Sequence, residues 1–309
     1  MVSKKGEYMK NLISMRDLSK KEILYFMEIA KKIEKGDLNP DMDKKLAALL
    51  FFEPSTRTHF SFATAMKKIG GQTITMRGTS SSSVKKGETF ADTLQTIAQY
   101  AEIIIMRSPI EGAARYASEV VDVPVVNAGD GANQHPTQAL LDLYSIIKTQ
   151  GNLENLTIGI AGDLRFGRTV HSLVQALSEF NPRFKFISPS FLKMPTYILD
   201  DLNEKNIKFE ELTEIYEKID ELDILYVTRI QKERFADLED YEKVKGSYIL
   251  ERSMLKGVKE NFKVMHPLPR VDEISTDVDN TEFAYYFPQA KNGVYMRQAI
   301  ITILLGGVK

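Results

Sequence analysis

Short apolar runs alternate with amphipathic segments along most of the chain. The runs have the length and composition of buried strands, and they lie near residues 46–52, 103–106, 123–126, 156–161, 184–188, 223–228 and 262–266. The segments between them carry apolar residues at helical spacing, so strands and helices are expected to alternate. This pattern is typical of parallel sheets flanked by helices, and it predicts an α/β fold.

Two helices have clear start and stop signals. Ser19 and Glu22 form a capping box before a helix that ends at Gly36. A longer helix opens at Pro136 and stops before Gly151, and we interpret it as the link between two domains.

The length of 309 residues suits two domains. We expect each domain to be a parallel sheet flanked by helices, and long helices to link the two. The expected domains are residues 1–149 and 150–289, with a C-terminal helix at about 290–309 that packs back on the first domain.

The composition argues against several classes of function. The 41 Lys and Arg are balanced by 42 Asp and Glu without a basic block, which argues against nucleic acid or a membrane surface as the main partner. The chain has no Cys, so disulfides, thiolate catalysis and Cys-liganded metal sites are excluded. No secretory or transit peptide is evident, and no apolar run reaches the roughly 18 residues that cross a bilayer, so we expect a cytoplasmic protein.

Polar motifs follow several of the predicted strands. They occupy residues 53–58, 107, 128–138, 162–168, 228–231 and 266–270. In open parallel sheets ligands bind at the carboxyl ends of the strands, so these motifs are the candidate binding residues. They would bring five or more cationic groups together in a chain whose net charge is -1. We therefore expect a strongly anionic ligand.

The stretch Ser55, Thr56, Arg57 and Thr58 stands directly after a predicted strand and opens an amphipathic helix. A helix N-terminus offers N–H donors and the positive end of the helix dipole, and the hydroxyls and the guanidinium add further donors. Composition alone would favour plain N-capping by Ser or Thr. The position after a strand, together with Arg57, favours a phosphate site instead.

His135 and Gln138 stand at the start of the long helix, where an imidazole and a carboxamide can bind a carbonyl or an amide. A buried structural histidine is an equally good interpretation of His135. Residues 80–88 hold four serines and two lysines, Lys85 and Lys86. Such a polar loop is more often only solvated surface.

Seven motifs occur in an order that resembles one enzyme family. They are FFEPSTRT, SVKKGET, MRSPIEGAAR, NAGDGANQHPTQ, GDLRFGRTVHSL, YVTRIQKERF and HPLPRVDEI. Through them the sequence is similar to the catalytic chains of the aspartate carbamoyltransferase family. The resemblance covers essentially the whole chain.

The resemblance implies transfer of a carbamoyl group from carbamoyl phosphate to the amino group of L-aspartate, an early step of de novo pyrimidine (UMP) biosynthesis. It implies neither a metal nor an organic cofactor. It assigns carbamoyl phosphate binding to Ser55, Thr56, Arg57, Thr58, Ser82, Arg107, His135 and Gln138. It assigns aspartate binding to Lys86, Arg168, Arg229, Gln231, Pro267 and Leu268.

The catalytic residues that the resemblance implies are Arg57, Thr58, Lys86, Arg107 and His135. The neutral amine of aspartate would attack the carbamoyl carbon, and the donors on Thr58, Arg107 and His135 would stabilise the oxyanion. The motifs supply no evident carboxylate base near the amine. The leaving phosphate as the acceptor of the amine proton is therefore a hypothesis.

The resemblance also implies an assembly. Ser82 and Lys86 match positions that reach the active site of a neighbouring subunit, so we expect a homotrimer with shared sites. Glu53 matches a position that bridges to Arg168 and Arg234 when the domains close, and the alternative is a local salt bridge of little energy. Residues 111–115 resemble a surface that binds a separate regulatory chain in some relatives, and the sequence leaves this partner open.

Two positions depart from the family pattern. His59 and Phe166 stand where relatives often carry Arg and Tyr, which leaves subunit contacts and allostery in doubt.

Ornithine carbamoyltransferase is the nearest alternative, but Arg229 would repel a cationic acceptor and attract a dicarboxylate. An N-acylated amino acid as acceptor is disfavoured. A dinucleotide-binding module lacks the G-x-G-x-x-G spacing, and an inactive scaffold would require losses among the matched residues, of which we find none.

Overall fold

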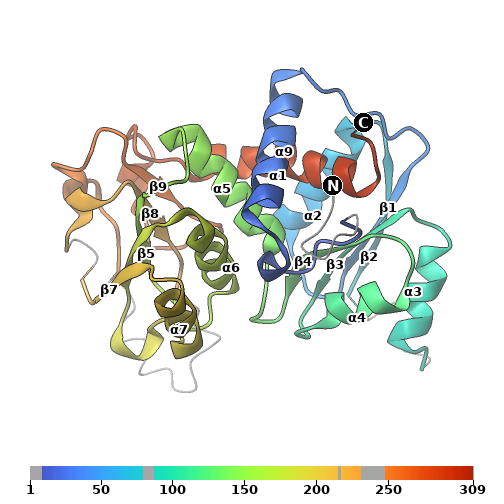
Figure 1. Cartoon of the computed structure of the whole chain (residues 1–309), viewed down its shortest axis with the longest axis horizontal. Coiled ribbons are helices and arrows are strands. Elements are labelled where there is room, and N and C mark those ends of the chain that lie inside the picture. The colour runs from blue at the N-terminus through green and yellow to red at the C-terminus, as the bar shows by residue number, and fades with distance from the viewer. Residues whose placement is uncertain (1–8, 79–86, 215–216, 231–247, 309) are drawn as a thin grey trace. The chain divides into compact units, whose positions relative to one another are not determined.

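The computed structural model describes residues 9–78, 87–214, 217–230 and 248–308 (Figure 1). The chain divides into two compact units, which we describe separately. Unit 1 comprises Met1–Tyr144 and Lys291–Lys309, and unit 2 comprises Ser145–Ala290. Among the described residues, no helix is both long and apolar enough to span a bilayer.

Unit 1 contains a parallel sheet of four strands in the order β2-β1-β3-β4 (Figure 1). The strands are β1 (Leu46–Phe51), β2 (Gln72–Arg77), β3 (Ile103–Ser108) and β4 (Val125–Asp130). Successive residues of a strand point to opposite faces, and β1 is buried on both. On one face, Ala48 and Leu50 pack against the helices α3 (Phe90–Ala98) and α4 (Ala113–Val120).

The other helices of unit 1 begin with recognisable signals. In α1 (Lys20–Lys35) both bonds of the predicted capping box are present, and Gly36 ends the helix with a left-handed backbone. Helix α2 (Thr56–Lys68) follows β1 and contacts β1 and β2. Helix α5 (Pro136–Gln150) has the bounds that the sequence predicted.

Unit 2 contains a parallel sheet of five strands in the order β7-β6-β5-β8-β9. The strands are β5 (Thr157–Ala161), β6 (Arg183–Ile187), β7 (Lys208–Leu212), β8 (Ile224–Val227) and β9 (Lys263–Met265). The α-helices that follow β5 and β6 are α6 (Arg168–Leu177) and α7 (Thr196–Glu204). Short 3-10 helices in the chain are η1 (Met15–Asp17), η3 (Ser178–Phe180), η4 (Ser190–Leu192), η5 (Ile219–Glu221), η7 (Arg252–Leu255) and η8 (Thr276–Val278).

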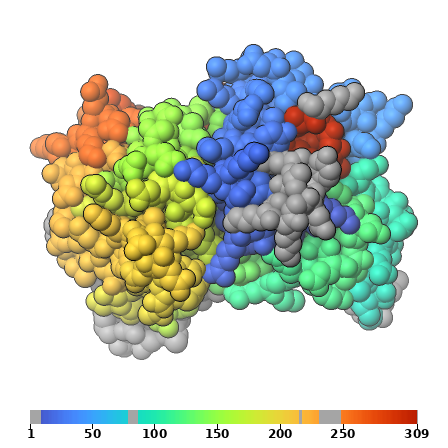
Figure 2. Space-filling view, viewed as in Figure 1, coloured from blue at the N-terminus to red at the C-terminus, as the bar shows by residue number. Residues whose placement is uncertain are grey.

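Two long helices contain residues of both units. They are α5, which passes from unit 1 into unit 2 after Tyr144, and α9 (Tyr286–Leu304), which returns to unit 1 at Lys291. In Figure 2 the red C-terminal end of α9 lies beside blue atoms from the first part of the chain. An added Cβ on Gly307 would lie 2.2 Å from Met42 Cε, so this end is packed tightly against unit 1.

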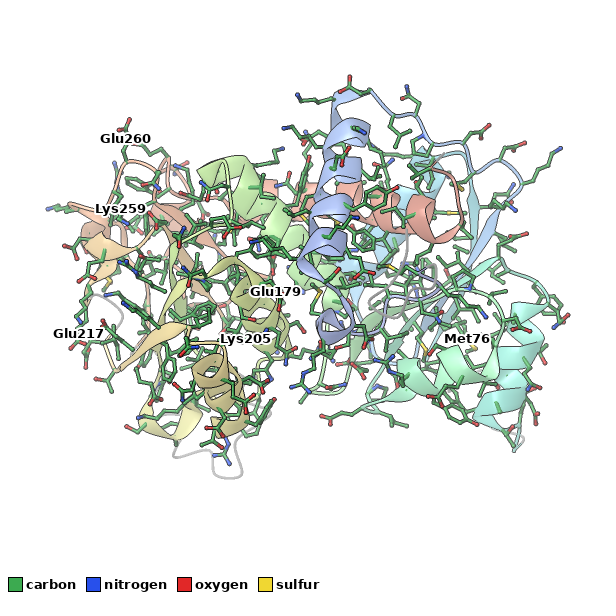
Figure 3. All side chains as sticks on the ribbon, in the orientation of Figure 1. Met76, Glu179, Lys205, Glu217, Lys259 and Glu260 are labelled. Carbon is green, nitrogen blue, oxygen red and sulfur yellow. The ribbon has the colours of Figure 1, made fainter. Side chains whose placement is uncertain are left out.

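The strands β2 and β7 were not predicted from the sequence. Both are outer strands of their sheets, and most of their residues are exposed or half-buried. An edge strand has one neighbour and a solvated face, so it needs no continuous apolar run. Elsewhere in unit 2, Lys205 Nζ lies 2.8 Å from Glu179 Oε1 and joins the end of α7 to η3 (Figure 3).

The backbone leaves no room for a side chain at Gly162, directly after β5. Its φ is 115°, and an added Cβ would lie 2.1 Å from the carbonyl oxygen of Thr228. Gly162→Ala should therefore lower the free energy of unfolding of unit 2 by roughly 2–4 kcal/mol, measured by urea denaturation. Gly257→Ala is the control, because Gly257 has a φ of 81° with nothing within 4 Å of an added Cβ. It should cost only about 1 kcal/mol, and equal losses at both positions would contradict the close contact.

Candidate active site

The sheet of unit 1 has a point where its connections diverge. From β1 the chain continues to β2 on one side, whereas β3 and then β4 lie on the other side. In parallel sheets the crevice for a ligand lies at such a switch point, beyond the carboxyl ends of the strands. The segment after β1 leads into α2, and Arg107 lies beside it near the end of β3, paired with Phe51. The predicted phosphate residues and Arg107 therefore share one edge of one sheet.

Helix α2 begins at Thr56, and Ser55 is its N-cap residue. Ser55 makes no side-chain capping hydrogen bond, so plain N-capping does not explain this serine. Thr58 is 8% exposed in the first turn of the helix. The N–H groups and the helix dipole make this end suited to an anion.

Arg107 connects three strand ends of unit 1. Its Nε lies 3.2 Å from Glu53 Oε2 after β1, and its Nη1 donates to the carbonyl oxygen of Ala128 in β4 at 3.3 Å. The side chain is only 11% exposed. These contacts hold the guanidinium in one orientation at the carboxyl edge of the sheet. Glu53 therefore makes a local ion pair here, which is the alternative considered for it from the sequence.

A network around Asp130 shapes the loop that leads to His135. Asp130 is 2% exposed, and its Oδ1 accepts hydrogen bonds from Asn127 Nδ2 at 2.9 Å and from the N–H of Gln134 at 3.0 Å. Its Oδ2 accepts from the N–H of Gly112 at 2.8 Å. These bonds fold the loop into one shape directly before α5. Asp130 was not predicted to have a role, although the residue lies inside one of the polar motifs.

His135 and Gln138 are both buried at the start of α5, with exposures of 4% and 8%. Thr137 Oγ1 lies 3.4 Å from His135 Nδ1. Gln138 Nε2 donates to Asp142 Oδ1 at 2.9 Å, one turn further along the helix. The imidazole and the carboxamide therefore come from the first turn of one helix, as the sequence predicted.

His59 holds α2 against the sheet. Its Nδ1 accepts from Arg77 Nη2 at 3.2 Å, so its Nε2 carries the proton and donates to Thr75 Oγ1 at 3.1 Å. Burial lowers the pKa of His59, and the charge of Arg77 lowers it further. His59, which departs from the family pattern, therefore connects α2 to β2 within unit 1.

The sheet of unit 2 has a switch point of the same kind between β5 and β8. The chain continues from β5 to β6 and β7 on one side, whereas β8 and β9 lie on the other. Arg168 is the first residue of α6, and Gly167 before it makes no side-chain cap. Arg229 follows β8, where Thr228 donates its N–H to the carbonyl oxygen of Ala161 in β5 at 2.8 Å. The two predicted aspartate-binding arginines thus follow neighbouring strands.

Pro267 and Leu268 lie in a turn after β9 that a buried histidine supports. His266 is 2% exposed, and its Nδ1 accepts from the N–H of Leu268 at 2.7 Å. Its Nε2 then carries the proton and donates to Glu273 Oε1 at 2.7 Å. Leu268 has a φ of 57°, which costs energy for a residue with a side chain and is typical of functional turns.

The predicted residues fall into three groups. In unit 1 the structure contains Glu53, Ser55, Thr56, Arg57, Thr58, Arg107, His135 and Gln138. In unit 2 it contains Arg168, Arg229, Pro267 and Leu268. Ser82, Lys86, Gln231 and Arg234 lie outside the described residues. Within the described ranges, no group of three or more His, Asp or Glu is arranged to hold a metal ion.

The pair of His266 and Glu273 makes part of the stability of unit 2 dependent on pH. Burial raises the pKa of Glu273, but the hydrogen bonds that its carboxylate accepts from His266 and from the N–H group of Val271 outweigh this effect, and the pKa is lowered from 4.5. Its stabilising effect is therefore fully present above pH 4.5 and is lost as the pH falls through the lowered folded-state value. Oε2 of Glu273 also accepts from the N–H groups of Val271 and Asp272 at 3.1 and 3.2 Å.

Glu273→Gln should lower the free energy of unfolding by about 1.5–3 kcal/mol at pH 7, because an amide nitrogen cannot accept those bonds. The difference from the unmodified chain should shrink in urea denaturation series toward pH 3. Asp272→Asn, at the exposed neighbouring carboxylate, is the control and should leave this pH dependence unchanged. A difference that stays constant with pH would contradict the assignment.

Both parts of the chain match known domains. Residues 10–148 match the domain described as "Aspartate/ornithine carbamoyltransferase, carbamoyl-P binding domain". Residues 154–304 match "Aspartate/ornithine carbamoyltransferase, Asp/Orn binding domain". The two matches together include nearly all of the described elements.

Relatives from bacteria and archaea align over almost the full length. The aspartate carbamoyltransferase catalytic subunit of Parabacteroides distasonis is 52% identical over 298 residues, covering 96% of this chain and 97% of the relative. That of Thermococcus kodakarensis is 52% identical over 302 residues, with coverages of 96% and 97%.

Solved structures have the same fold. The catalytic subunit of M. jannaschii aspartate transcarbamoylase has a TM-score of 0.90 at 52% identity, covering 96% of this chain and 98% of that one. Trypanosoma cruzi aspartate transcarbamoylase in complex with N-(phosphonacetyl)-L-aspartic acid has a TM-score of 0.88 at 36% identity, with 95% of each chain covered. On both domain matches and on identity along nearly its whole length, the chain belongs to the aspartate/ornithine carbamoyltransferase family.

Proposed function

We propose that this chain transfers the carbamoyl group of carbamoyl phosphate to the amino group of L-aspartate, giving N-carbamoyl-L-aspartate and phosphate. The observation that carries this conclusion is full-length similarity to chains named aspartate carbamoyltransferase catalytic subunits. The T. cruzi relative has been solved with carbamoyl phosphate and aspartate bound. The reaction is an early step of pyrimidine biosynthesis, and a cytoplasmic location suits a chain without Cys.

Unit 1 supplies the carbamoyl phosphate residues in this proposal. Ser55, Thr56, Arg57 and Thr58 bind the phosphate at the N-terminus of α2, with Ser82 added from the family pattern. Arg107 contacts the phosphate and the carbonyl oxygen, and His135 and Gln138 contact the carbonyl and the amide. The support is that the described members of this set lie near the end of β3 or in the segments that follow β1 and β4, three neighbouring strands of a single parallel sheet.

Unit 2 supplies the aspartate residues. Arg168 and Arg229 follow neighbouring strands, and the fork of a guanidinium suits a carboxylate. The carbonyl groups of Pro267 and Leu268 border the substrates in the turn that His266 supports. Lys86 and Gln231 complete the set by family resemblance alone. We propose domains of 1–149 and 150–289, with the C-terminal helix at 290–309 belonging to the first.

The chemical step depends on preorganised donors. As the neutral amine attacks the carbamoyl carbon, negative charge grows on the carbonyl oxygen, and Thr58, Arg107 and His135 stabilise it. Each such donor contributes roughly 3–4 kcal/mol when it is held in position. Arg107 is held by its hydrogen bond to the carbonyl oxygen of Ala128 in β4, and by Glu53 until the domains close. The leaving phosphate is the proposed acceptor of the amine proton.

Assembly and closure are further parts of the proposal. Ser82 and Lys86 reach a neighbouring subunit in a homotrimer, so that each active site is shared. Glu53 exchanges its local pair with Arg107 for Arg168 and Arg234 when the domains close on the substrates. Relatives are named catalytic subunits, and the segment 111–115 is the surface where a regulatory chain would bind.

The acceptor is tested by a colorimetric assay for the carbamoyl product. The purified chain should form product from carbamoyl phosphate with L-aspartate and none with L-ornithine, because Arg168 and Arg229 repel a cationic acceptor. Light scattering in parallel should give the mass of a trimer. Turnover with ornithine would contradict the acceptor assignment, and no turnover with either amine would indicate a missing partner chain or an inactive scaffold.

The role of His135 is tested by His135→Ala. The turnover number should fall by about 10²–10³-fold, because one oxyanion donor is lost. His59→Gln is the control in the same unit, since His59 contacts Arg77 and Thr75 and should change turnover far less. An unchanged rate in His135→Ala would contradict the oxyanion role.

A further inference from the structure

A buried arginine connects the two helices that carry the phosphate and carbamoyl residues of unit 1. Arg297 lies on α9 and is 3% exposed. Its Nη1 donates to Ser61 Oγ on α2 at 2.9 Å, and its guanidinium carbon lies 5.0 Å from the centre of the Phe62 ring. Ser61 stands one turn after the phosphate-binding start of α2. Arg297 therefore packs directly behind that turn.

Asp142 on α5 is completely buried and interacts electrostatically with Arg297. Burial lowers the pKa of Arg297 to about 10, and the charge of Asp142 acts against this shift. The arginine is therefore still protonated at neutral pH, beside a carboxylate in the same core. Such buried pairs contribute little net stability, because desolvating both charges offsets their attraction. A contribution to stability therefore does not by itself explain why Arg297 and Asp142 are buried together.

The pair has a direct connection to the candidate active site. Asp142 Oδ1 accepts a hydrogen bond from Gln138 Nε2 at 2.9 Å. A carboxylate oxygen can only accept, so it fixes which end of the Gln138 amide faces it. The amide oxygen of Gln138 is then directed away from Asp142. A carbamoyl group carries an NH₂, and an NH₂ needs an acceptor.

We propose that Asp142, paired with Arg297, is a positioning residue that fixes the amide of Gln138 so that its oxygen accepts from the NH₂ of the carbamoyl group. The site then selects carbamoyl phosphate over acyl phosphates that carry a methyl group in place of the NH₂. This inference rests on the carbamoyl-binding role of Gln138 in the proposed function. The phosphate itself is bound by α2, so phosphate binding does not depend on the orientation of this amide.

The test replaces the buried pair with apolar groups of similar size, Asp142→Leu with Arg297→Met, because removing one charge alone would leave the other buried and unpaired. Calorimetry then measures the affinity of the full chain for carbamoyl phosphate, acetyl phosphate and inorganic phosphate. Carbamoyl phosphate should bind about 10-fold to 100-fold more weakly, the loss expected when a buried NH₂ group is left without its acceptor. Acetyl phosphate and inorganic phosphate should change by less than about 3-fold.

A second comparison keeps the inference separate from the proposed function. Gln138→Ala should weaken carbamoyl phosphate binding, and adding the pair replacement to it should cause no further loss, because the pair acts through Gln138. Asp142→Asn retains the size of the side chain and allows the Gln138 amide to turn, so it should lose part of the same selectivity. If the chain binds carbamoyl phosphate but does not carbamoylate aspartate, the proposed function is wrong. The ratio of the affinities for carbamoyl phosphate and acetyl phosphate still tests the positioning role of Asp142 in that case.

Three outcomes would overturn the positioning role. The first is equal weakening of all three ligands in the pair replacement, which a purely structural role would produce. The second is unchanged carbamoyl phosphate affinity in a variant whose thermal unfolding matches that of the original chain. The third is a loss that adds fully to that of Gln138→Ala.

Discussion

Parallel strands cannot be joined by tight turns, because each connection must carry the chain back across the sheet before the next strand begins. Where one connection goes to the left and the next to the right, the strand ends between them are left open. Each unit of this chain has one such point, between β1 and β3 in unit 1 and between β5 and β8 in unit 2. The described candidate residues follow from this constraint, since they come from the segments that leave these strands or adjoin them.

In both units a helix begins soon after one of these strands, and its N-cap residue makes no side-chain hydrogen bond. Both α2 and α6 begin at a residue that makes no side-chain cap, Ser55 in one case and Gly167 in the other. A serine that makes no capping bond forgoes about 1 kcal/mol of helix stability, whereas a glycine at the N-cap costs only a few tenths. In the proposed function the phosphate of the substrate takes the place of the cap at α2. Ligand binding would then stabilise the folded state by mass action.

Most of the interior of the fold was predictable from the sequence, because buried strands such as β1 and β5 are continuous apolar runs. The capping box of α1 and both ends of α5 were predicted from local signals that the structure confirms. The edge strands β2 and β7 were missed, because a strand with one neighbour and a solvated face has a mixed composition. The candidate motifs were found through their positions after strands. Asp130 and Arg297 were missed because their roles depend on partners such as Gly112 and Ser61, which no local pattern identifies.

Unit 1 is assembled from the two ends of the chain, whereas unit 2 is one continuous stretch. During synthesis the first 144 residues emerge early, but Lys291–Lys309, which carries the arginine behind the phosphate turn, emerges only after unit 2. Unit 2 has all of its sequence available before that segment exists. Since domains fold as units while the chain grows, the part synthesised first can complete its core only after the part synthesised second. Most of unit 1 is thus synthesised before unit 2, but the hydrophobic core of unit 2 can form completely before that of unit 1.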